Sequence, residues 1–488
     1  MNPIHFTDGY KVDHRSQYPA GTTLVYANLT PRKSRMPGVD SVVFFGLQYA
    51  IKKYLVDDFD RHFFRQPKEQ VLARYQRRIE TYLGPGAITY EHIAALHGLG
   101  YLPLEIRALP EGARVPMRVP MFTIHNTLPE FFWLTNFLET LLSAALWLPC
   151  TSATIAAEFR KLLEHYAKHT GSDPAFVDWQ GHDFSFRGMG GLEAAMLSGA
   201  AHLLSFTGTD SIPAIDWLEE YYGADAEREL IGGSVPATEH SVMCMGTQDG
   251  EIGTFRRLIE EVYPRGIVSI VSDTWDFWQV ITDFMPRLKY AILQRDGKVV
   301  IRPDSGDPVH ILCGDPSAPA GSPEHRGAVA CLWDTFGGSI TPKGYKLLDP
   351  HIGVIYGDNI TLDRCRAICA GLAEKGFASG NIVFGIGSFT YQYVTRDTFG
   401  FAMKATYGEV NGQGRAIFKD PKTDDGAKRS ARGLLRVDRN EAGELTLKDN
   451  CTWEEARGGE LELVFRDGAL LKEQTFQEIR KMVCGQSS

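Results

Sequence analysis

The sequence lacks closely spaced cysteine pairs. Its 488 residues include eight cysteines, and none of them forms a C-x-x-C pair. Such scattered usage fits reduced thiols in a cytoplasm. Cys365 and Cys369 are four residues apart on one face of a predicted helix, so we expect both to pack in the core.

The sequence also lacks an excess of positive charge. Lys and Arg number 51 against 60 Asp and Glu, for a formal net charge of −9. A broad duplex-binding surface needs a basic face, so we expect no nucleic-acid partner. Any anionic ligand must therefore be held by a local cluster of cations.

No segment has the features of a secretion signal or of a membrane span. The first residues, MNPIHFTDGYKVDH, contain no basic stretch followed by an apolar one. The most apolar window, residues 131–150, carries Asn136 and Glu139 and has Pro149 at its end. This window therefore predicts a buried helix rather than a membrane span.

The chain shows no internal repeat of fixed period, and its length predicts about two or three domains. Residues 314–327 are rich in Pro and Gly and predict an exposed insertion, and residues 419–433 predict a second loop. Beyond that loop, alternating polar and apolar residues predict short antiparallel strands at 434–437, 444–448 and 460–465.

The middle of the chain contains short apolar runs that end in small or acidic residues: 266–273, 298–307, 352–358 and 381–388. Strands buried on both faces of a sheet have this continuous apolar character. Between the last two runs, residues 361–375 predict a helix with Thr361 as its N-cap and Gly376 just beyond its end. Strand, helix and strand at this spacing predict a parallel sheet.

Ligands of parallel sheets bind at the carboxyl ends of the strands. We therefore expect one rim to collect Asp273, Arg302, Asp304, Asp358, Gly385 and Gly387. The alternative is that these are ordinary turn residues, because Asp and Gly are common in turns. Similar strand ends repeated in succession favour a site.

The segment GIGS, residues 385–388, can offer bare backbone N–H groups to a phosphate, and Arg396 can add a cation. Neither a P-loop nor a complete GxGxxG motif accompanies it. Asp304 and Asp358 suit ribose hydroxyls, or Mg²⁺ held chiefly by ligand phosphates.

Three segments upstream contribute further candidates. HDFSFRG contains Phe184 and Arg187, SFTGTDS contains Asp210, and GGSVPATEHS contains His240. Each residue also has a structural explanation by itself, as a core aromatic, a surface cation, a helix N-cap and a loop histidine, respectively.

Ten segments follow one another along the chain: HDFSFRG, FTGTDS, SVPATEHS, VSDTWD, RPDSGDP, GYKLL, GDNI, FGIGS, TRD and FKDP. In this order they closely resemble the nicotinamide phosphoribosyltransferase family. TDGYKVDHRSQYP and FFGLQY match the same family, so the resemblance extends from about Thr7 to Arg480. RPDSGD is shared with nicotinate phosphoribosyltransferases, whereas the GTD and ATEHS segments look more like the nicotinamide branch.

The resemblance implies a type II phosphoribosyltransferase α/β barrel joined to a β-rich domain built from both chain ends. Residues 1–150 would form the N-terminal part of an α+β domain, 151–397 the barrel, and 398–488 a β-rich segment packing back on the N-terminal part. The implied reaction transfers phosphoribosyl from 5-phosphoribosyl 1-pyrophosphate to nicotinamide, giving nicotinamide mononucleotide and pyrophosphate in NAD salvage. Mg²⁺, ATP as a co-substrate, a cytoplasmic location and a homodimer with a shared active site are implied as well.

The resemblance also implies a binding site for the base. Phe184 would stack on one face of the pyridine ring, and a Tyr10 contributed by the partner subunit would cover the other. Asp210 would accept a hydrogen bond from the carboxamide NH₂. A carboxylate at that position repels the carboxylate of nicotinate, so it favours nicotinamide.

The same resemblance implies sites for the sugar and the phosphates. The residues beside the ribose and Mg²⁺ would be Arg302, Asp304, Asp358 and, in an assisting role, Asp273. The 5′-phosphate would bind the backbone of Gly357, Gly387 and Ser388. Phosphate and pyrophosphate would also meet cations, some reaching across from the partner: Arg32, Arg187, Arg396, Lys404, Lys419 and Lys428.

His240 matches the family histidine that ATP phosphorylates, which couples ATP hydrolysis to tighter substrate binding. Imidazole is a competent phosphoryl acceptor near neutral pH because one ring nitrogen is unprotonated. The chain departs from the family in two places. Ser388 replaces a Gly, since IGSFTYQ stands where vertebrate members have SGGGLLQ, and Phe186 lacks the hydroxyl of the Tyr in DFGYRG.

Other functions remain open at this point. A nicotinate phosphoribosyltransferase would differ in base choice, which Asp210 controls. A non-catalytic pyridine-nucleotide sensor has no need of Asp304, Asp358 and His240. An unrelated barrel hydrolase needs two carboxylates around a glycosidic bond and a water, which suits the aromatic and cationic residues poorly.

Overall fold

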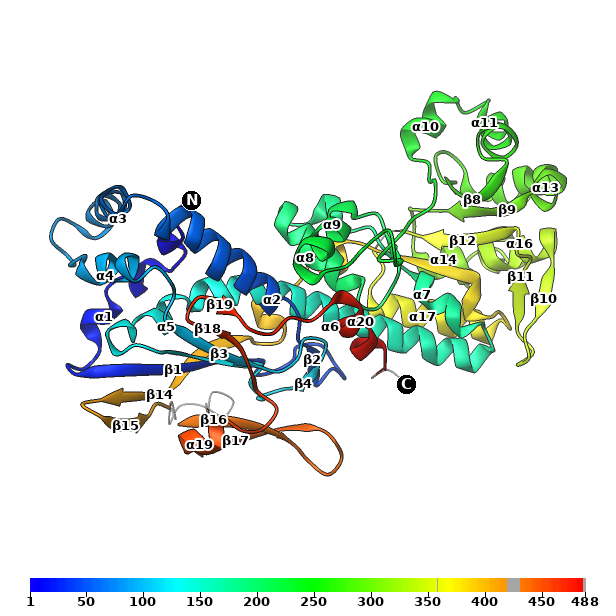
Figure 1. Cartoon of the computed structure of the whole chain (residues 1–488). Helices are drawn as coiled ribbons and strands as arrows, with labels where there is room; N and C mark the ends of the chain where they lie inside the picture. The colour runs from blue at the N-terminus through cyan, green and yellow to red at the C-terminus, as the bar shows by residue number, and fades with distance from the viewer. Residues whose placement is uncertain (358, 419–430, 486–488) are drawn as a thin grey trace.

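The structure is a computed structural model that describes residues 1–357, 359–418 and 431–485. The predicted site residues Asp358, Lys419 and Lys428 lie outside these residues. Two sheets organise the fold, an antiparallel one at the left of Figure 1 and a parallel one at the right. Helix α6 (Glu139–Thr170) runs from one to the other.

The antiparallel sheet is built from both ends of the chain. Its strand order is β15-β14-β1-β5-β3-β18-β19. Its N-terminal strands are β1 (Thr22–Thr30), β3 (Leu104–Ala108) and β5 (Phe122–Asn126). Its C-terminal strands are β14 (Ala402–Val410), β15 (Gln413–Ala416), β18 (Glu462–Arg466) and β19 (Ala469–Leu470). Because β1 pairs with β14 on one side and β5 on the other, both chain ends are needed to complete the sheet, as the family resemblance implies.

Alternation of burial explains why these strands pack on one face. In β3 the side chains of Leu104, Ile106 and Ala108 are buried, whereas those of the intervening residues are half-buried. Three further antiparallel pairs lie outside the main sheets: β2 (Ser41–Val43) with β4 (Arg114–Pro116), β10 (Gly338–Ile340) with β11 (Lys346–Leu348), and β16 (Leu434–Arg439) with β17 (Leu445–Cys451). Strands β16, β17 and β18 confirm the predicted strands of the C-terminal region.

Helices and helical turns cover both sheets. Those of the N-terminal part are α1 (His14–Gln17), α2 (Leu47–Ala50) with its π-helical continuations η3 (Ile51–Asp58) and η4 (Asp60–Phe64), α3 (Lys68–Leu83), α4 (Glu91–Leu99) and α5 (Leu134–Phe137). Those around the parallel sheet include α7 (Val177–Gln180), α8 (Leu192–His202), α9 (Ile212–Tyr222), α10 (His240–Met245), α11 (Glu251–Arg257), α12 (Phe277–Gln279), α13 (Met285–Leu293), α14 (Pro308–Cys313), α15 (Pro323–Arg326), α16 (Ala328–Phe336), α17 (Leu362–Glu374) and α18 (Ser388–Tyr391). The C-terminal part has α19 (Trp453–Ala456) and α20 (Phe476–Gly485).

The apolar window around residue 140 is a buried helix, but the helix does not stop at its proline. Helix α6 continues through Pro149 to Thr170. A proline inside a helix removes one hydrogen bond and costs about 3 kcal/mol. Here its ring packs against Gly46, where an added Cβ would lie 2.8 Å from Pro149 Cγ, and burial offsets the loss. Among the described residues α6 alone is long and apolar enough to cross a membrane, and 72% of its most apolar window is buried inside the fold.

The parallel sheet has six strands in the order β7-β6-β13-β12-β9-β8. They are β6 (Gly181–Asp183), β7 (Gly208–Thr209), β8 (Arg265–Val271), β9 (Asp296–Arg302), β12 (Ile352–Tyr356) and β13 (Ile382–Ile386). The four apolar runs of the sequence correspond to β8, β9, β12 and β13, and every neighbouring pair in this sheet is parallel. This confirms the predicted α/β architecture.

An irregular segment joins the two edge strands of this sheet. Gly233 bridges to Gly208 of β7, and Ala237 bridges to Ser269 of β8. Residues 233–237 therefore lie between β7 and β8 and close the strands into a barrel. The sequence shows this segment only as a Gly- and Pro-rich loop, because its pairing is too short to leave an apolar strand pattern.

The predicted helix between β12 and β13 is α17. The side chain of Thr361 accepts a hydrogen bond from the backbone N–H of Arg364, and Gly376 follows the helix end with φ +78°. Cys365 and Cys369 are both fully buried, as predicted. All eight cysteines are free.

The C-terminal helix packs back on the barrel side of the molecule. Phe476, Ile479 and Val483 of α20 lie in one apolar cluster with Trp217 and Tyr222 of α9. The predicted limits at residues 150 and 397 fall inside α6 and the short 3₁₀ turn η11 (Arg396–Thr398), respectively. The domain limits themselves stay a prediction.

Candidate active site

The carboxyl ends of the parallel strands lie along one edge of the sheet. β6 leads into Phe184, β7 into Asp210, β8 into Asp273, β9 into Asp304 and β12 into Gly357. Since neighbouring strands are parallel and in register, these residues are brought to the same rim. The convergence predicted from the sequence is therefore found for Asp273, Arg302 and Asp304, whereas Gly385 differs.

An aromatic side chain lies at the centre of this rim. A Cβ added to Gly385 would lie 2.4 Å from Cδ2 of Phe184, and one added to Gly357 would lie 3.2 Å from Cε2 of the same ring. The absence of side chains at both glycines makes room for Phe184. Gly385 lies inside β13 rather than after it, so its place is beneath the ring and not in the loop that follows the strand.

Asp210 is held by two hydrogen bonds to one of its oxygens. His182 Nε2 is 2.9 Å from Asp210 Oδ1, and the Ser234 hydroxyl donates to the same oxygen over 2.7 Å. Burial opposes ionisation, but these hydrogen bonds, with Arg302 nearby, hold the pKa of Asp210 below its usual value. The side chain is 49% exposed, so an ionised carboxylate is presented to ligands.

His182 links the aromatic ring to the carboxylate. Its ring centroid is 4.8 Å from that of Phe184. It lies against the backbone of β7, where a Cβ on Gly208 would be 2.7 Å from His182 Nδ1. Phe184 and Asp210 are therefore set at a fixed separation by one imidazole.

The end of β8 forms a second hydrogen-bonded group. Asp273 Oδ2 accepts from the backbone N–H of Asp304 over 2.9 Å and from the Ser305 hydroxyl over 2.6 Å. Its other oxygen, Oδ1, is 3.2 Å from Nε2 of His240. Asp273 has 4% of its side chain exposed and His240 49%, so a buried carboxylate orients an accessible imidazole.

Arg302 lies between these two groups. Its Nη2 donates to the carbonyl of Thr238, two residues before His240. Its Nε is 3.6 Å from Asp304 Oδ2, and it is buried without a hydrogen-bond partner in the part of the chain that the structure describes. A buried guanidinium nitrogen of this kind is suited to a polar ligand atom.

The loop after β13 faces the loop after β6. Gly387 is the N-cap of α18, and a Cβ added to it would meet nothing within 4 Å. A Cβ on Gly188 would lie 2.0 Å from Ser388 Oγ, so the turn that carries Arg187 packs directly on Ser388. Arg187 itself is exposed. The loop after β13 and the turn that carries Arg187 are therefore in contact at Ser388, with open space beside Gly387.

Three predicted cations lie on the antiparallel-sheet side. Arg32 donates from Nε to the carbonyl of Gly400 over 3.0 Å, close to the turn that holds Arg396. Arg396 pairs with Asp397 at 3.2 Å. Lys404 lies in β14 opposite Asn28 of β1. The role of these three cations in binding phosphate stays a prediction.

Tyr10 also lies apart from the rim within this chain. It belongs to the 3₁₀ turn η2 (Gly9–Lys11), has 65% of its surface exposed, and packs edge-on against His14. No contact with Phe184 is recorded for it in the described chain. Asp358, Lys419 and Lys428 lie outside the described residues, so their roles stay predictions.

The residues present fit a magnesium ion bound mainly by a ligand. Among the described residues there is no cluster of three or more His, Cys, Asp or Glu side chains able to hold a metal. Mg²⁺ commonly binds through one or two carboxylates together with substrate phosphates and water. The Asp304 carboxylate, 32% exposed at the end of β9, is a hard oxygen donor of the required type.

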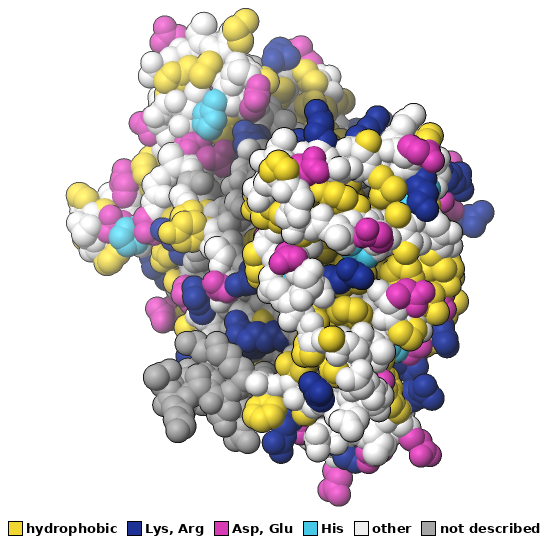
Figure 2. Space-filling model, turned by 90° about the vertical axis from the view of Figure 1, so that its left-hand side faces the viewer, with side chains coloured by type: hydrophobic (Ala, Val, Ile, Leu, Met, Phe, Trp, Pro, Cys, Tyr) yellow, Lys and Arg dark blue, Asp and Glu magenta, His cyan; other side chains and the backbone are white. Residues whose placement is uncertain are grey.

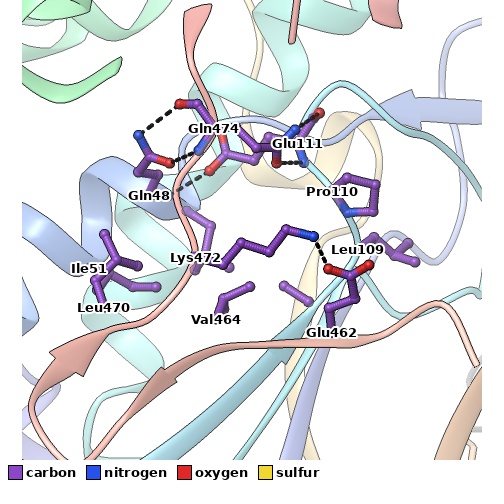
Figure 3. A pocket seen from close by; sticks show the side chains of 12 residues that line it. Gln48, Ile51, Leu109, Pro110, Glu111, Glu462, Val464, Leu470, Lys472 and Gln474 are labelled. Carbon is purple, nitrogen blue, oxygen red and sulfur yellow. Dashed lines mark hydrogen bonds and ion pairs between the residues drawn. The ribbon is translucent and has the colours of Figure 1, made fainter. Parts of the chain in front are cut away.

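Neither the charge on the displayed surface nor the small cavity beside the antiparallel sheet indicates a second ligand-binding site. Figure 2 shows Lys and Arg interspersed with Asp and Glu on the displayed face, without one broad basic surface. The cavity of Figure 3, about 30 Å³, has room for about one water. Around it Gln48, Glu111 and Gln474 hydrogen-bond to one another's main chains and join the two chain ends.

Sequence reasoning missed three residues of the rim. The motifs HDFSFRG and GGSVPATEHS contain His182, Ser234 and Thr238, but no sequence pattern assigns these three residues a role. His182 lies in β6 and Phe184 directly follows that strand, two positions later, so this spacing was the available signal that both side chains lie on the same side. Ser234 and Thr238 reach the site only because residues 233–237 close the barrel.

Comparison with known families agrees with this architecture. The model of the nicotinate phosphoribosyltransferase (NAPRTase) family matches residues 179–460, and that of the nicotinamide phosphoribosyltransferase N-terminal domain matches residues 2–106. Among solved structures, nicotinate-nucleotide pyrophosphorylase from Pyrococcus furiosus has a TM-score of 0.60 at 14% identity, covering 100% of this chain and 96% of that chain. Human nicotinic acid phosphoribosyltransferase has a TM-score of 0.55 at 16% identity, covering 98% and 93%. Both likenesses show the fold.

Curated relatives narrow the family further. The chain is 56% identical to the nicotinamide phosphoribosyltransferase of Acinetobacter baylyi, over 100% of this chain and 98% of the relative. It is 35% identical to the nicotinamide phosphoribosyltransferase of Mycoplasma pneumoniae, over 86% of this chain and 92% of the relative. The chain therefore belongs to the nicotinate phosphoribosyltransferase family, and within that family to the nicotinamide phosphoribosyltransferases.

Proposed function

We propose that this enzyme transfers phosphoribosyl from 5-phosphoribosyl 1-pyrophosphate to nicotinamide, giving nicotinamide mononucleotide and pyrophosphate for NAD salvage. The observation that carries the proposal is the ionised Asp210 carboxylate fixed beside Phe184 by His182. The relatives named nicotinamide phosphoribosyltransferase support the same activity.

Asp210 explains the choice of base. The recorded side-chain hydrogen bonds from His182 and Ser234 both reach Oδ1, which leaves Oδ2 to accept from a carboxamide NH₂. The pyridine ring then lies against Phe184, as flat aromatic surfaces favour. Nicotinate would place its carboxylate against that of Asp210, and like charges at this distance repel.

Bond formation requires positioning more than acid–base chemistry. The pyridine nitrogen attacks C1 of the ribose as the C1–O bond to pyrophosphate breaks, and the bonding electrons leave with pyrophosphate. The ribose carries oxocarbenium character between these events, so Asp304 beside the sugar stabilises developing positive charge. Arg302 binds near the base and ribose, and holding both reactants in line supplies much of the rate enhancement.

The phosphate groups are bound at the other side of the rim. We assign the 5′-phosphate to the backbone of Gly357, Gly387 and Ser388, with Arg187 adjacent. Arg32, Arg396, Lys404, Lys419 and Lys428 are assigned to phosphate and pyrophosphate. Asp304 and Asp358 would hold Mg²⁺ through the ligand phosphates, and bound Mg²⁺ would neutralise charge on the departing pyrophosphate.

ATP coupling is the second part of the proposal. His240 is accessible, and Asp273 accepts from one of its nitrogens, which leaves the other ring nitrogen as a nucleophile for the γ-phosphate of ATP. Asp273 also accepts a hydrogen bond from the backbone N–H of Asp304. A shift of the Asp273 carboxylate when His240 is phosphorylated would therefore move Asp304 beside the sugar. Phosphorylation of His240 would thereby tighten substrate binding.

A homodimer completes the proposed site. Tyr10 is exposed and lies apart from Phe184 within one chain, as expected if the Tyr10 ring serves the site of a second copy. We propose that the dimer works in the cytoplasm, in line with free cysteines throughout.

The test is product formation by the purified protein with 5-phosphoribosyl 1-pyrophosphate and Mg²⁺. Nicotinamide and nicotinic acid are offered in parallel, with and without ATP, and mononucleotide is quantified by chromatography. We expect product from the amide and stimulation by ATP. Product from the acid alone would make the chain a nicotinate enzyme, and no product from either base would favour a pyridine-nucleotide sensor.

A further inference from the structure

A buried histidine lies beneath the rim without touching the ligand positions. His202, the last residue of α8, is fully buried. Its Nδ1 is 2.7 Å from the hydroxyl of Tyr391, and its Nε2 is 3.0 Å from the carbonyl of Gly208. Neither contact is needed for the chemistry assigned above.

The chemistry of the partners fixes the direction of both hydrogen bonds. The Gly208 carbonyl can only accept, so Nε2 of His202 carries the proton and donates to it. Burial lowers the pKa of His202 to about 4, so the ring is neutral near pH 7 and Nδ1 is an acceptor. The Tyr391 hydroxyl therefore donates to Nδ1, and a continuous chain of hydrogen bonds runs from Tyr391 to Gly208.

Each end of this chain is attached to a different half of the site. Gly208 begins the two-residue edge strand β7, and Asp210 follows directly after that strand. Tyr391 is the last residue of α18, and its backbone N–H donates to the carbonyl of Gly387 over 3.2 Å. The first residue of α18 is Ser388, so the Tyr391 side chain anchors the loop assigned to the 5′-phosphate.

Both attached elements are too short to hold their positions alone. β7 has two residues and α18 has four, so neither has enough internal hydrogen bonds to be rigid by itself. Tyr391 is fully buried like His202, and its ring meets the imidazole edge-on with centroids 5.8 Å apart. Movement of one element therefore displaces the other through a packed, hydrogen-bonded contact.

We propose that the Tyr391–His202–Gly208 hydrogen-bond chain couples the base-binding and phosphate-binding halves of the site, so that nicotinamide and the sugar phosphate bind cooperatively. The proposal rests on the function proposed above. Tyr391 and His202 act as positioning residues, since both are buried beneath the rim. Occupation of either half would fix the shared contact and lower the ordering cost of filling the other.

Binding measurements test this coupling without turnover. The dissociation constant of nicotinamide is measured by calorimetry alone and with saturating ribose 5-phosphate. For the unmodified enzyme we expect ribose 5-phosphate to tighten nicotinamide binding by roughly fivefold or more, the low end of ordinary coupling between sites. In Tyr391→Phe the ratio should fall toward one.

Two variants of His202 each keep one of its two hydrogen bonds and remove the other. An Asn side chain places an oxygen near the position of Nδ1 and keeps an acceptor for Tyr391, whereas a Gln side chain places an N–H near Nε2 and keeps a donor for Gly208. Since the chain needs both bonds, His202→Asn and His202→Gln should each lose the coupling. The matched control is Tyr222→Phe, which removes another fully buried hydroxyl bound to Glu111 Oε2 over 2.9 Å.

The outcomes distinguish coupling from packing. If Tyr391→Phe and Tyr222→Phe lose similar thermal stability but only the former loses the binding ratio, the coupling is supported. If both keep the ratio of the unmodified enzyme, or if that enzyme shows a ratio of one, the proposal is overturned. Failure of the unmodified enzyme to bind nicotinamide at all would instead contradict the proposed function.

Discussion

Replacement of Asp210 by Asn tests the origin of base choice most directly. Asn has nearly the same shape and keeps a carbonyl oxygen, so the hydrogen bonds from His182 and Ser234 can persist. The substitution removes the negative charge and replaces Oδ2, the proposed acceptor for the carboxamide, by an NH₂ group that can only donate. Its two expected effects act in opposite directions on nicotinamide and nicotinate.

The size of the expected change in kcat/KM depends on how far the Asp210 side chain is exposed to solvent. A hydrogen bond to a charged acceptor contributes about 1.5–3 kcal/mol, so kcat/KM for nicotinamide should fall roughly 10- to 150-fold. Two like charges 4 Å apart repel by about 4 kcal/mol at an effective dielectric constant near 20. Because the Asp210 side chain is 49% exposed, solvent reduces this repulsion to about 1–2 kcal/mol, a gain of roughly 5- to 30-fold for nicotinate. The ratio of kcat/KM for nicotinamide to that for nicotinate should therefore fall by roughly 50- to 4,500-fold.

Competition assays with both bases measure that ratio in a single reaction. The control is Asp216→Asn, which removes a charge from the exposed face of α9 outside the rim. An Asp210→Asn enzyme that loses activity on nicotinamide without gaining any on nicotinate would leave the attraction intact and remove the repulsion argument. An unchanged ratio would refute both.

Three further predictions concern the rest of the molecule. His240→Ala should abolish stimulation by ATP while the ATP-independent rate persists, measured as product formed with and without ATP; equal stimulation in both enzymes would contradict the phosphohistidine. Gly385→Ala places a Cβ 2.4 Å from Phe184 Cδ2, so KM for nicotinamide should rise about tenfold or more, whereas Gly253→Ala, with open space around it, should not change KM. Burial raises the pKa of Glu251 to about 7 from 4.5, so the stability it contributes is full below pH 4.5 and is lost as pH rises through 7. Glu251→Gln should therefore raise Tm relative to the unmodified enzyme at pH 8 but not at pH 4, and an equal difference at both pH values would contradict the assignment.

Much of the barrel was predictable because its signals are local. The apolar runs at β8, β9, β12 and β13 mark strands of the parallel sheet, and Thr361 and Gly376 mark the limits of α17. Asp273, Arg302 and Asp304 follow directly from the rule that ligands bind at the carboxyl ends of parallel strands. Assignment of the family needed only the motifs in order.

The remaining features depend on contacts between distant residues. Helix α6 passes through Pro149 because Gly46, more than a hundred positions earlier, leaves space for the ring. His182 and Ser234 meet at Asp210 because residues 233–237 close the barrel. The sequence of that loop has no periodicity that predicts its pairing with β7 and β8. Gly385, expected in a phosphate loop, instead makes room for Phe184.

The sequence by itself determined the chemical groups of this protein: the carboxylates, cations and aromatic residue that we propose bind a pyridine and a phosphorylated sugar, and the strands that carry them. The tertiary structure alone decided how these groups act on one another, because hydrogen bonds such as those of His182 to Asp210 and of Tyr391 to His202 join residues 28 and 189 positions apart. Side-chain type and strand period are properties of a few consecutive residues, whereas the orientation of a carboxylate or an imidazole depends on neighbours that only folding brings within about 3 Å.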